Sequence, residues 1–179
     1  MIRLQTPILE SSRLKLRAGD EILLSGIIYT ARDQAHKNIV EALKNNQELP
    51  FEFENQVVYY VGPAPAKPGM PIGACGPTTS YRMDPYSIIL MPKGLKIMIG
   101  KGDRSDSFKH SLKKEKAVYL IAIGGIGALL SKTVKSSSLI AYPELQSEAV
   151  YKLEVEDFPC IVAYDSLGND VFQNSETLE

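Results

Sequence analysis

The densest group of polar side chains in the sequence lies between Gly76 and Asp84, which reads Gly-Pro-Thr-Thr-Ser-Tyr-Arg-Met-Asp. Free backbone N–H groups at a helix start, with hydroxyls beside them, can bind a carboxylate or a phosphate. Arg82 follows Thr78 by four residues, so one helical turn could direct both side chains at one ligand. The alternative is an ordinary helix cap, in which a hydroxyl accepts from the free N–H groups and Arg82 is exposed. The spacing leaves both interpretations open, and they are compatible.

A second group runs from Tyr29 to Lys37 and places Arg32 where an expected strand meets an expected helix. A guanidinium at such a junction can hold a carboxylate through two parallel hydrogen bonds. His36 follows Arg32 by about one helical turn and would lie on a similar face. The alternative makes Asp33 a capping acid and His36 a core histidine, which for an isolated histidine is the more common case.

Lys101 stands between two glycines, Gly100 and Gly102, and between an expected strand and an expected helix. Flanking glycines let the backbone come close to a ligand, and a lysine supplies a point charge. The tripeptide alone is also typical of an exposed turn, so it gains meaning only beside the other two groups.

Residues 124–130, Gly-Gly-Ile-Gly-Ala-Leu-Leu, invite comparison with a dinucleotide-binding turn. That fingerprint requires Gly or Ala where Leu130 stands, and no acidic residue follows at the right distance. The segment instead predicts a tight strand-to-helix turn with close packing, and we reject a nucleotide site here.

Composition excludes several classes of protein. The chain has 179 residues, 44% hydrophobic and 23% charged, which is typical of one globular domain. A net charge of −1 gives no reason to expect nucleic acid or an anionic membrane as partner. No apolar stretch approaches the roughly 20 residues of a membrane span, and the start lacks a signal peptide, so we expect a cytoplasmic protein. Two cysteines, Cys75 and Cys160, and two histidines show no metal-ligand spacing, so we expect no metal or cofactor site within this chain.

Hydrophobic periodicity outlines the elements. Strands are expected at 14–17, 21–30, 57–61, 95–99, 117–123, 139–141, 151–155 and 160–164, and helices at 33–43, 79–91 with a break near Pro85, 103–114 and 124–132. A proline-dense surface connector spans 62–69. Strands first, and then strands alternating with helices, predict one mixed α/β domain with a β-rich first half.

Together these segments resemble the C-terminal region of class I fumarases and the β subunit of the related tartrate dehydratases. The likeness extends through Val155 to Pro159 and so covers nearly the whole chain. Several ordered motifs at similar separations are more specific than any one of them. The matching strings are Tyr29 to Lys37, Gly76 to Asp84, Gly100 to Gly102, and Ala122 to Ile126.

The resemblance implies an α/β fold, a single swivelling β/β/α domain over residues 1–179 with a mixed sheet and flanking helices. It also implies a hydro-lyase that reversibly hydrates fumarate to (S)-malate. In the family, three cysteines of another subunit or of the N-terminal domain hold a [4Fe–4S] cluster, whose iron without a protein ligand binds substrate as a Lewis acid. With two cysteines, this chain is expected to be a β subunit. It would be active only with a cluster-bearing α subunit, in a heterotetramer or a dimer of heterodimers.

The family's substrate-binding residues fall on Arg32, Thr78, Arg82 and Lys101. A dicarboxylate dianion needs at least two cationic clamps, which these residues supply. The family gives Thr78 the role of catalytic base, together with an acid on the partner subunit. A threonine hydroxyl is a poor base, so neighbouring cations must stabilise its alkoxide. His36 is a weaker candidate, either orienting Arg32 or serving the subunit interface.

Two other functions stay open. An L(+)-tartrate dehydratase β subunit would act on a substrate that differs by one hydroxyl, and the motifs do not separate it from a fumarase. A non-catalytic binding or interaction module could keep the same anion pocket. A partner chain with three cluster cysteines would favour the enzyme.

Overall fold

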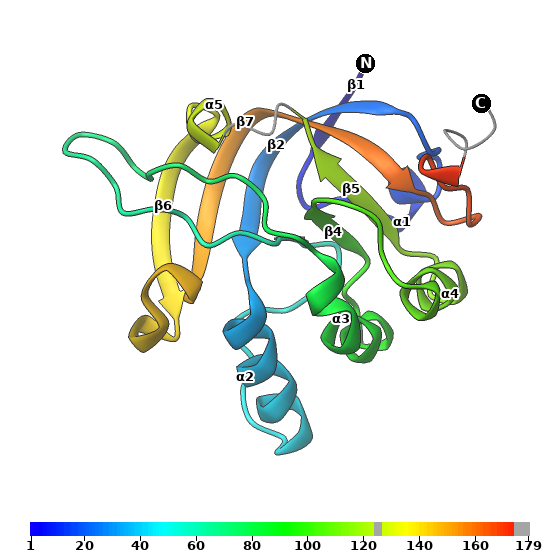
Figure 1. Cartoon of the computed structure of the whole chain (residues 1–179), viewed down its shortest axis with the longest axis horizontal. Coiled ribbons are helices and arrows are strands. Elements are labelled where there is room, and N and C mark those ends of the chain that lie inside the picture. Colours follow the sequence, from blue (N-terminus) through cyan, green and yellow to red (C-terminus); the bar gives the residue numbers. More distant parts are fainter. Residues whose placement is uncertain (124–126, 174–179) are drawn as a thin grey trace.

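Seven strands form one sheet in the computed structural model of the chain, which describes residues 1–123 and 127–173 (Figure 1). Strands β2 to β5 lie side by side in parallel, and β7 pairs antiparallel with both β5 and β2. These five strands therefore close into a barrel. The strands are β1 (Ile2–Gln5), β2 (Glu21–Thr30), β3 (Val57–Tyr59), β4 (Ile97–Gly100), β5 (Val118–Ala122), β6 (Val134–Ala141) and β7 (Val150–Tyr164).

The two remaining strands extend the sheet beyond the barrel. β1 pairs in parallel with the first half of β2, and β3 pairs with the last residues of β2 on the same side. β6 pairs antiparallel with the first part of β7. The prediction of a mixed sheet with flanking helices is confirmed.

Three helices connect the parallel strands: α2 (Asp33–Lys44) joins β2 to β3, α3 (Asp84–Leu90) precedes β4, and α4 (Asp106–Lys114) joins β4 to β5. All three lie on one side of the sheet in Figure 1. The shorter elements are α1 (Glu10–Arg13), α5 (Gly127–Ser131), and the 3-10 turns η1 (Tyr81–Met83), η2 (Met91–Lys93) and η3 (Pro143–Glu148). Among the described residues, no helix has the length and apolarity that crossing a membrane requires.

Strands β3 and β4 are buried on both faces along their whole length, and β5 over its first three residues, which explains their continuous apolar runs. In β3, Val57 and Tyr59 belong to the core inside the barrel, whereas Val58 belongs to the core beneath the helices. The helices supply residues such as Ile39 and Phe108 to that outer core. The period of two along each strand thus divides the interior into a barrel core and a helix-side core.

The predicted strand at 14–17 is wrong. The backbone N–H of Leu14 donates to the carbonyl of Glu10, and that of Leu16 donates to the carbonyl of Arg13, so α1 runs on into a turn. Leu16 is the one residue of this turn that packs in the barrel core. Its polar neighbours Lys15 and Arg17 give the segment the alternating pattern of a strand. The first strand is instead Ile2–Gln5, a run of four residues in which only Leu4 is partly buried, and it was not predicted from the sequence.

Two boundaries also differ from expectation. β7 is one strand and not two, because the polar interruption around Asp157 (φ +53°) is a bulge that shifts the register against β2. Helix α4 begins at Asp106 and not at Asp103, since Ser105 is its N-cap and accepts a hydrogen bond from the N–H of Phe108 (3.2 Å). The predicted turn at Gly124 and Gly125 lies outside the described residues.

Candidate functional site

The predicted site residues follow the carboxyl ends of neighbouring parallel strands. Arg32 lies two residues after β2, Thr78 lies in the connection that follows β3, and Lys101 follows β4 directly. The carboxyl ends of parallel strands meet at one edge, where α/β sheets commonly bind ligands. The fold therefore brings to one edge groups that are up to 69 residues apart in the chain (101 − 32).

Thr78 and Arg82 are in direct contact. Nη2 of Arg82 donates to Oγ1 of Thr78 at 3.0 Å, and the N–H of Thr78 donates to the carbonyl of Tyr60 at 2.9 Å. Ser80 precedes the turn η1 but makes no capping bond with its side chain. The Ser80 hydroxyl therefore does not cap the turn, contrary to the capping alternative. The side chain of Arg82 is 43% exposed.

Arg82 also joins the two sequence groups, because its Nη2 lies 3.6 Å from Oδ2 of Asp33. Asp33 is the neighbour of Arg32, whose Nε lies 3.9 Å from Oε1 of Glu148 in the turn η3. Within residues 1–123 and 127–173, that Nε has no hydrogen-bond partner. Both guanidiniums thus lie near carboxylates in loose ion pairs, which engage few of their five N–H donors.

His36 lies in the core directly behind Arg32. It is 1% exposed, and its Nδ1 lies 2.8 Å from the carbonyl of Arg32. A carbonyl only accepts, so Nδ1 carries the hydrogen. Burial lowers the pKa of His36 to about 4, and the imidazole is neutral at pH 7. It supports the backbone of Arg32 and is not exposed for contact with another chain.

Lys101 is joined to the Thr78 segment through Ser80. The N–H of Lys101 donates to Oγ of Ser80 at 2.8 Å, and the N–H of Ser80 donates to the carbonyl of Lys101 at 3.2 Å. A side chain at Gly100 would collide with Oγ of Ser80, so only glycine fits there. Lys101 and Pro77 help to line a hollow of about 170 Å³ at the carboxyl ends of β4 and β5.

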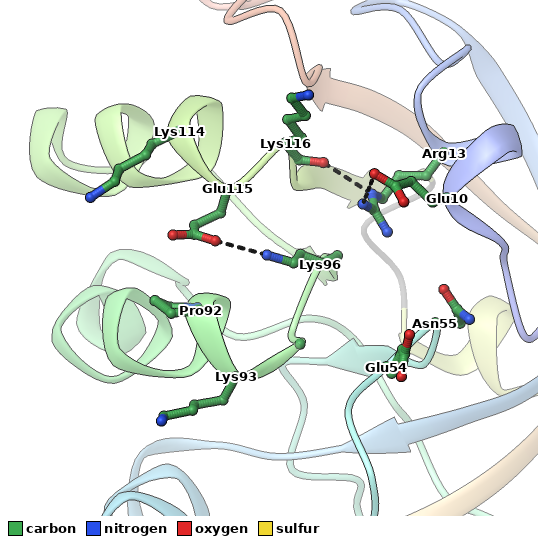
Figure 2. A pocket seen from close by; sticks show the side chains of 11 residues that line it. Glu10, Arg13, Glu54, Asn55, Pro92, Lys93, Lys96, Lys114, Glu115 and Lys116 are labelled. Atoms are coloured by element: carbon green, nitrogen blue, oxygen red, sulfur yellow. Dashed lines mark hydrogen bonds and ion pairs between the residues drawn. The ribbon is translucent and has the colours of Figure 1, made fainter.

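A larger hollow, about 410 Å³, lies at the opposite edge, where β4 and β5 begin (Figure 2). Its two least exposed cations, Lys96 and Arg13, already have partners within the chain. Nζ of Lys96 lies 2.9 Å from Glu115, and Nε of Arg13 donates to the carbonyl of Lys116 at 3.0 Å. None of the predicted site residues lines this hollow.

The two cysteines do not fit an iron–sulfur site. Both Cys75 and Cys160 are buried, and burial raises the pKa of their thiols to about 11 and about 12. A metal binds the thiolate, and burial of both side chains opposes the formation of that charge. In the described part of the chain, no group of three or more His, Cys, Asp or Glu side chains could hold a metal ion.

The Fumarase C-terminus family matches residues 1–175. The chain belongs to this family. Fumarate hydratase 2 of Leishmania major is 40% identical over 159 residues, which are 88% of this chain and 28% of that protein. The anaerobic class I fumarate hydratase of Escherichia coli is 42% identical over 152 residues, 84% of this chain and 28% of that protein. This fumarase C-terminal chain thus spans a little over a quarter of those relatives.

Another relative in the fumarase C-terminal family is of similar size. A Methanocaldococcus jannaschii protein, named putative L(+)-tartrate dehydratase subunit beta, is 39% identical over 165 residues. The match covers 89% of this chain and 85% of that protein. A protein of this family thus exists as a separate chain of about this length.

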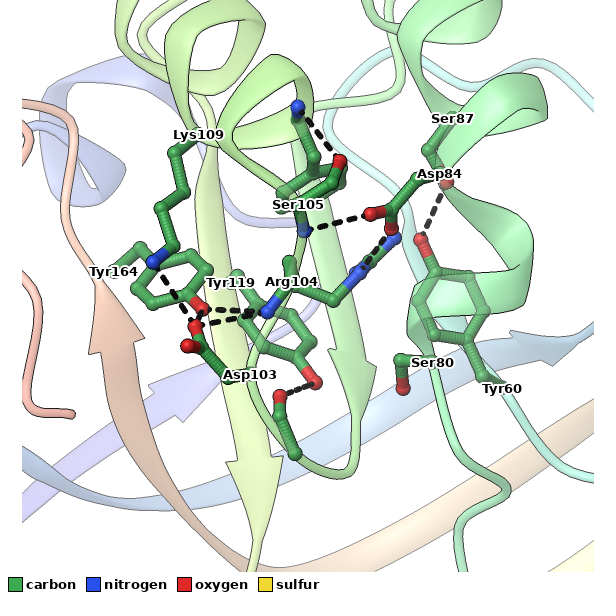
Figure 3. A network of polar contacts seen from close by, with 12 residues as sticks. Tyr60, Ser80, Asp84, Ser87, Asp103, Arg104, Ser105, Lys109, Tyr119 and Tyr164 are labelled. Atoms are coloured by element: carbon green, nitrogen blue, oxygen red, sulfur yellow. Dashed lines mark hydrogen bonds and ion pairs between the residues drawn. The ribbon is translucent and has the colours of Figure 1, made fainter.

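Several residues around the site escaped the sequence reasoning. A Cβ at Gly62 would lie 2.8 Å from Cδ of Arg32, and Glu148 reaches the same side chain. Asp84 and Arg104 form a buried ion pair (Figure 3). No signal in the sequence indicated the burial of Arg104, because it precedes the N-cap Ser105 and so lies outside the helix that presents Phe108 and Leu112 to the core.

Proposed function

We propose that this chain is the β subunit of a two-chain iron–sulfur hydro-lyase that reversibly hydrates fumarate to (S)-malate. The observation that carries the proposal is the contact of Arg82 with both Thr78 and Asp33, which gathers two cationic motifs at one sheet edge. Arg32, Arg82 and Lys101 would bind the two carboxylates of the substrate. The names of the fumarate hydratase relatives support this substrate class.

Thr78 would move the proton at carbon. In the dehydration direction its Oγ1 would take a proton from the carbon beside the hydroxyl-bearing carbon, and the C–O bond would break as the double bond forms. The departing hydroxyl would receive a proton from an acid on the partner and leave as water. The hydrogen bond from Arg82 to Oγ1 (3.0 Å) supports this role, because a guanidinium stabilises negative charge on that oxygen.

The cluster would belong to the partner. Cys75 and Cys160 are buried thiols with raised pKa values, so their chemistry does not suit cluster ligation. The [4Fe–4S] cluster of the α subunit would supply a Lewis-acidic iron to the substrate. This chain would contribute the anion clamps and Thr78, and the pair would assemble as a dimer of heterodimers.

The experiment is reconstitution. The chain is assembled anaerobically with a co-purifying chain that carries three cluster cysteines, and the rates of fumarate hydration and malate dehydration are measured. We expect turnover by the pair and none by this chain alone. Fumarase activity in the isolated chain, or an assembled pair that turns over no dicarboxylate, would contradict the proposal.

L(+)-tartrate dehydration is the second candidate, favoured by the size match to the Methanocaldococcus protein. The same reconstituted pair is assayed with L(+)-tartrate and (S)-malate at equal concentrations. Activity on tartrate but not on malate would replace the fumarase assignment. An anion-binding module without activity is a third outcome, in which the pair binds dicarboxylates but turns over neither.

The fold and its setting complete the proposal. We infer that residues 1–179 form a single domain of the swivelling β/β/α type, supported by the closed barrel and by the family match over residues 1–175. A swivelling domain would place the edge with Arg32, Arg82 and Lys101 against the cluster of the partner. We expect the assembled enzyme in the cytoplasm, where fractionation would find it with soluble metabolic enzymes.

A further inference from the structure

A buried ion pair joins Asp84 to Arg104 (Figure 3). Nε of Arg104 lies 2.5 Å from Oδ1 of Asp84, and the two side chains are 0% and 6% exposed. The other oxygen of Asp84 accepts from the N–H of Ser105 at 2.8 Å. The pair therefore fastens the start of α3 to the loop between β4 and α4.

Aromatic rings surround the guanidinium of Arg104. Its central carbon lies 3.6 Å from the ring centre of Phe108, 4.8 Å from that of Tyr119 and 5.1 Å from that of Tyr60. Among the described residues, Nη1 and Nη2 have no hydrogen-bond partner. Attraction to the ring faces compensates part of that loss, and the planar group is locked in one orientation.

The pair connects the two segments that carry the proposed ligands. Asp84 follows Arg82 by two residues, and Arg104 follows Lys101 by three. Tyr60, whose ring faces Arg104, accepts the N–H of Thr78 through its carbonyl. Any shift of Arg104 would therefore reach three of the four proposed ligands, Thr78, Arg82 and Lys101.

The loop is held from its other side as well. The N–H of Arg104 donates to the hydroxyl of Tyr164 at 2.8 Å, and that hydroxyl contacts Asp103. Nζ of Lys109 lies 3.1 Å from both Asp103 and Asp170. The backbone around Arg104 is thus anchored to β7 and α4, so its side chain has a fixed base from which to hold Asp84.

We infer that Arg104, held by Asp84, is a positioning residue that sets the distance between Lys101 and the Thr78–Arg82 contact. The inference rests on the proposed function. Stability is a weak reason for such a pair, because apolar side chains of similar volume usually stabilise a core as well as buried charges do. A fixed separation between cationic clamps is a different use, since a misplacement of about 1 Å can cost roughly a hundredfold in rate.

The test compares three variants in the assembled complex. Arg104→Lys keeps the charge but loses the planar group, and Asp84→Asn with Arg104→Met removes both charges without leaving one unpaired. Arg13→Lys is the matched control, because Arg13 is also 4% exposed but lies at the opposite edge. We expect kcat/KM for fumarate to fall about a hundredfold in the first two variants, with KM and kcat both affected, and to change less than twofold in the control.

A second measurement does not depend on turnover. Hydrogen exchange in the full chain should accelerate at least tenfold at the amides of Thr78 and Lys101 in the double variant, and stay unchanged at these amides in Arg13→Lys. A folded double variant with normal kcat/KM and normal exchange overturns the inference. If the wild-type complex hydrates no fumarate, the proposed function fails on its own, and the exchange result still decides whether Arg104 holds these segments together.

Discussion

The two edges of the parallel strands carry similar charged residues, but the cations differ in exposure and in the distance to their carboxylate partners. At the amino edge, Arg13 and Lys96 are 5% and 19% exposed, and each has a close partner within the chain. At the carboxyl edge, Arg32 and Arg82 are 28% and 43% exposed, and their carboxylate partners lie 3.9 Å and 3.6 Å away. A cation in a tight internal pair has little left to offer a ligand.

The contrast separates structural charges from available ones. The larger hollow lies at the amino edge, away from the proposed site, so the volume of the hollow is not what distinguishes the carboxyl edge. The carboxyl edge differs in that its arginines lie 3.6 to 3.9 Å from their carboxylate partners, while the backbone near Arg82 and Lys101 is held by the Asp84–Arg104 ion pair. The variants below test that distinction, beginning with the largest expected effect.

Arg82→Ala should have the largest effect on catalysis. It removes a proposed cationic clamp and the hydrogen bond to Oγ1 of Thr78. Loss of a charged partner at a desolvated anion typically costs 2 to 5 kcal/mol, so we expect kcat/KM of the assembled enzyme to fall by several hundredfold. Steady-state kinetics with fumarate and malate measure this directly.

The matched control is Lys93→Ala, which removes an exposed cation that lines the amino-edge hollow. Its kcat/KM should stay within twofold of the wild type. Equal losses of kcat/KM in Arg82→Ala and Lys93→Ala would mean that only the net charge of the chain matters. The proposed difference between the two edges would then be wrong.

The pH dependence of stability should report the neutral histidine behind Arg32. The folded-state pKa of His36 is about 4, below its usual value of 6.5, because the imidazole is buried. As the pH falls through 6.5, His36 becomes protonated in the unfolded chain but stays neutral in the folded chain. The free energy of unfolding should therefore fall between about pH 6.5 and pH 4, by up to roughly 3 kcal/mol.

Urea unfolding at several pH values, with matched variants, isolates this contribution. His36→Gln should lose the part of the slope between pH 6.5 and pH 4.5 that exceeds the carboxylate background. His110→Gln, which replaces the exposed histidine of α4, should keep the full slope. A wild-type slope that survives in His36→Gln would show that another group carries the proton.

Local sequence signals were sufficient for much of the fold. The apolar period of β2 and α2 was predicted within one residue, and Pro85 broke its helix where expected. Closure of the barrel was out of reach, because β7 must pair with β5 and also with β2, and its partners in β2 lie more than a hundred residues away in the chain. No local period encodes such a contact.

The site shows the same division. Arg32, Thr78, Arg82 and Lys101 stand out because glycines, hydroxyls and strand ends surround them in the sequence. The residues that hold them do not stand out, since Arg104 reads as the start of a polar helix although it is buried. Arg104 is buried because rings from distant parts of the chain, such as Tyr60 and Tyr119, pack around its guanidinium. The spacing of residues in the sequence does not reveal that these rings meet.

Gly62→Ala should move Arg32 without removing it. The added Cβ would lie 2.8 Å from Cδ and 3.1 Å from Nη1 of Arg32, so the side chain must shift. We expect KM to rise about tenfold with a smaller change in kcat, because a clamp is displaced and not lost. Gly69→Ala is the comparison in the same connector: its Cβ meets nothing within 4 Å, so it strains only its own backbone (φ +79°), does not touch Arg32, and should leave KM unchanged. An unchanged KM in Gly62→Ala would mean that Arg32 has another equally good position for the ligand.

The smallest effect is expected at the amino edge, in the Lys96–Glu115 pair (2.9 Å). Both side chains are about one fifth exposed, and pairs in that setting contribute roughly 0.2 to 1 kcal/mol. A double-mutant cycle of Lys96→Met and Glu115→Gln, followed by urea unfolding, should give a coupling energy of about 0.5 kcal/mol that shrinks in 1 M salt. kcat/KM of the assembled enzyme should stay unchanged in all three variants, because the pair neutralises itself far from Arg82. A change in KM for the dicarboxylate here would show that the amino edge also acts on the substrate, and that tight internal pairing does not take a cation out of use.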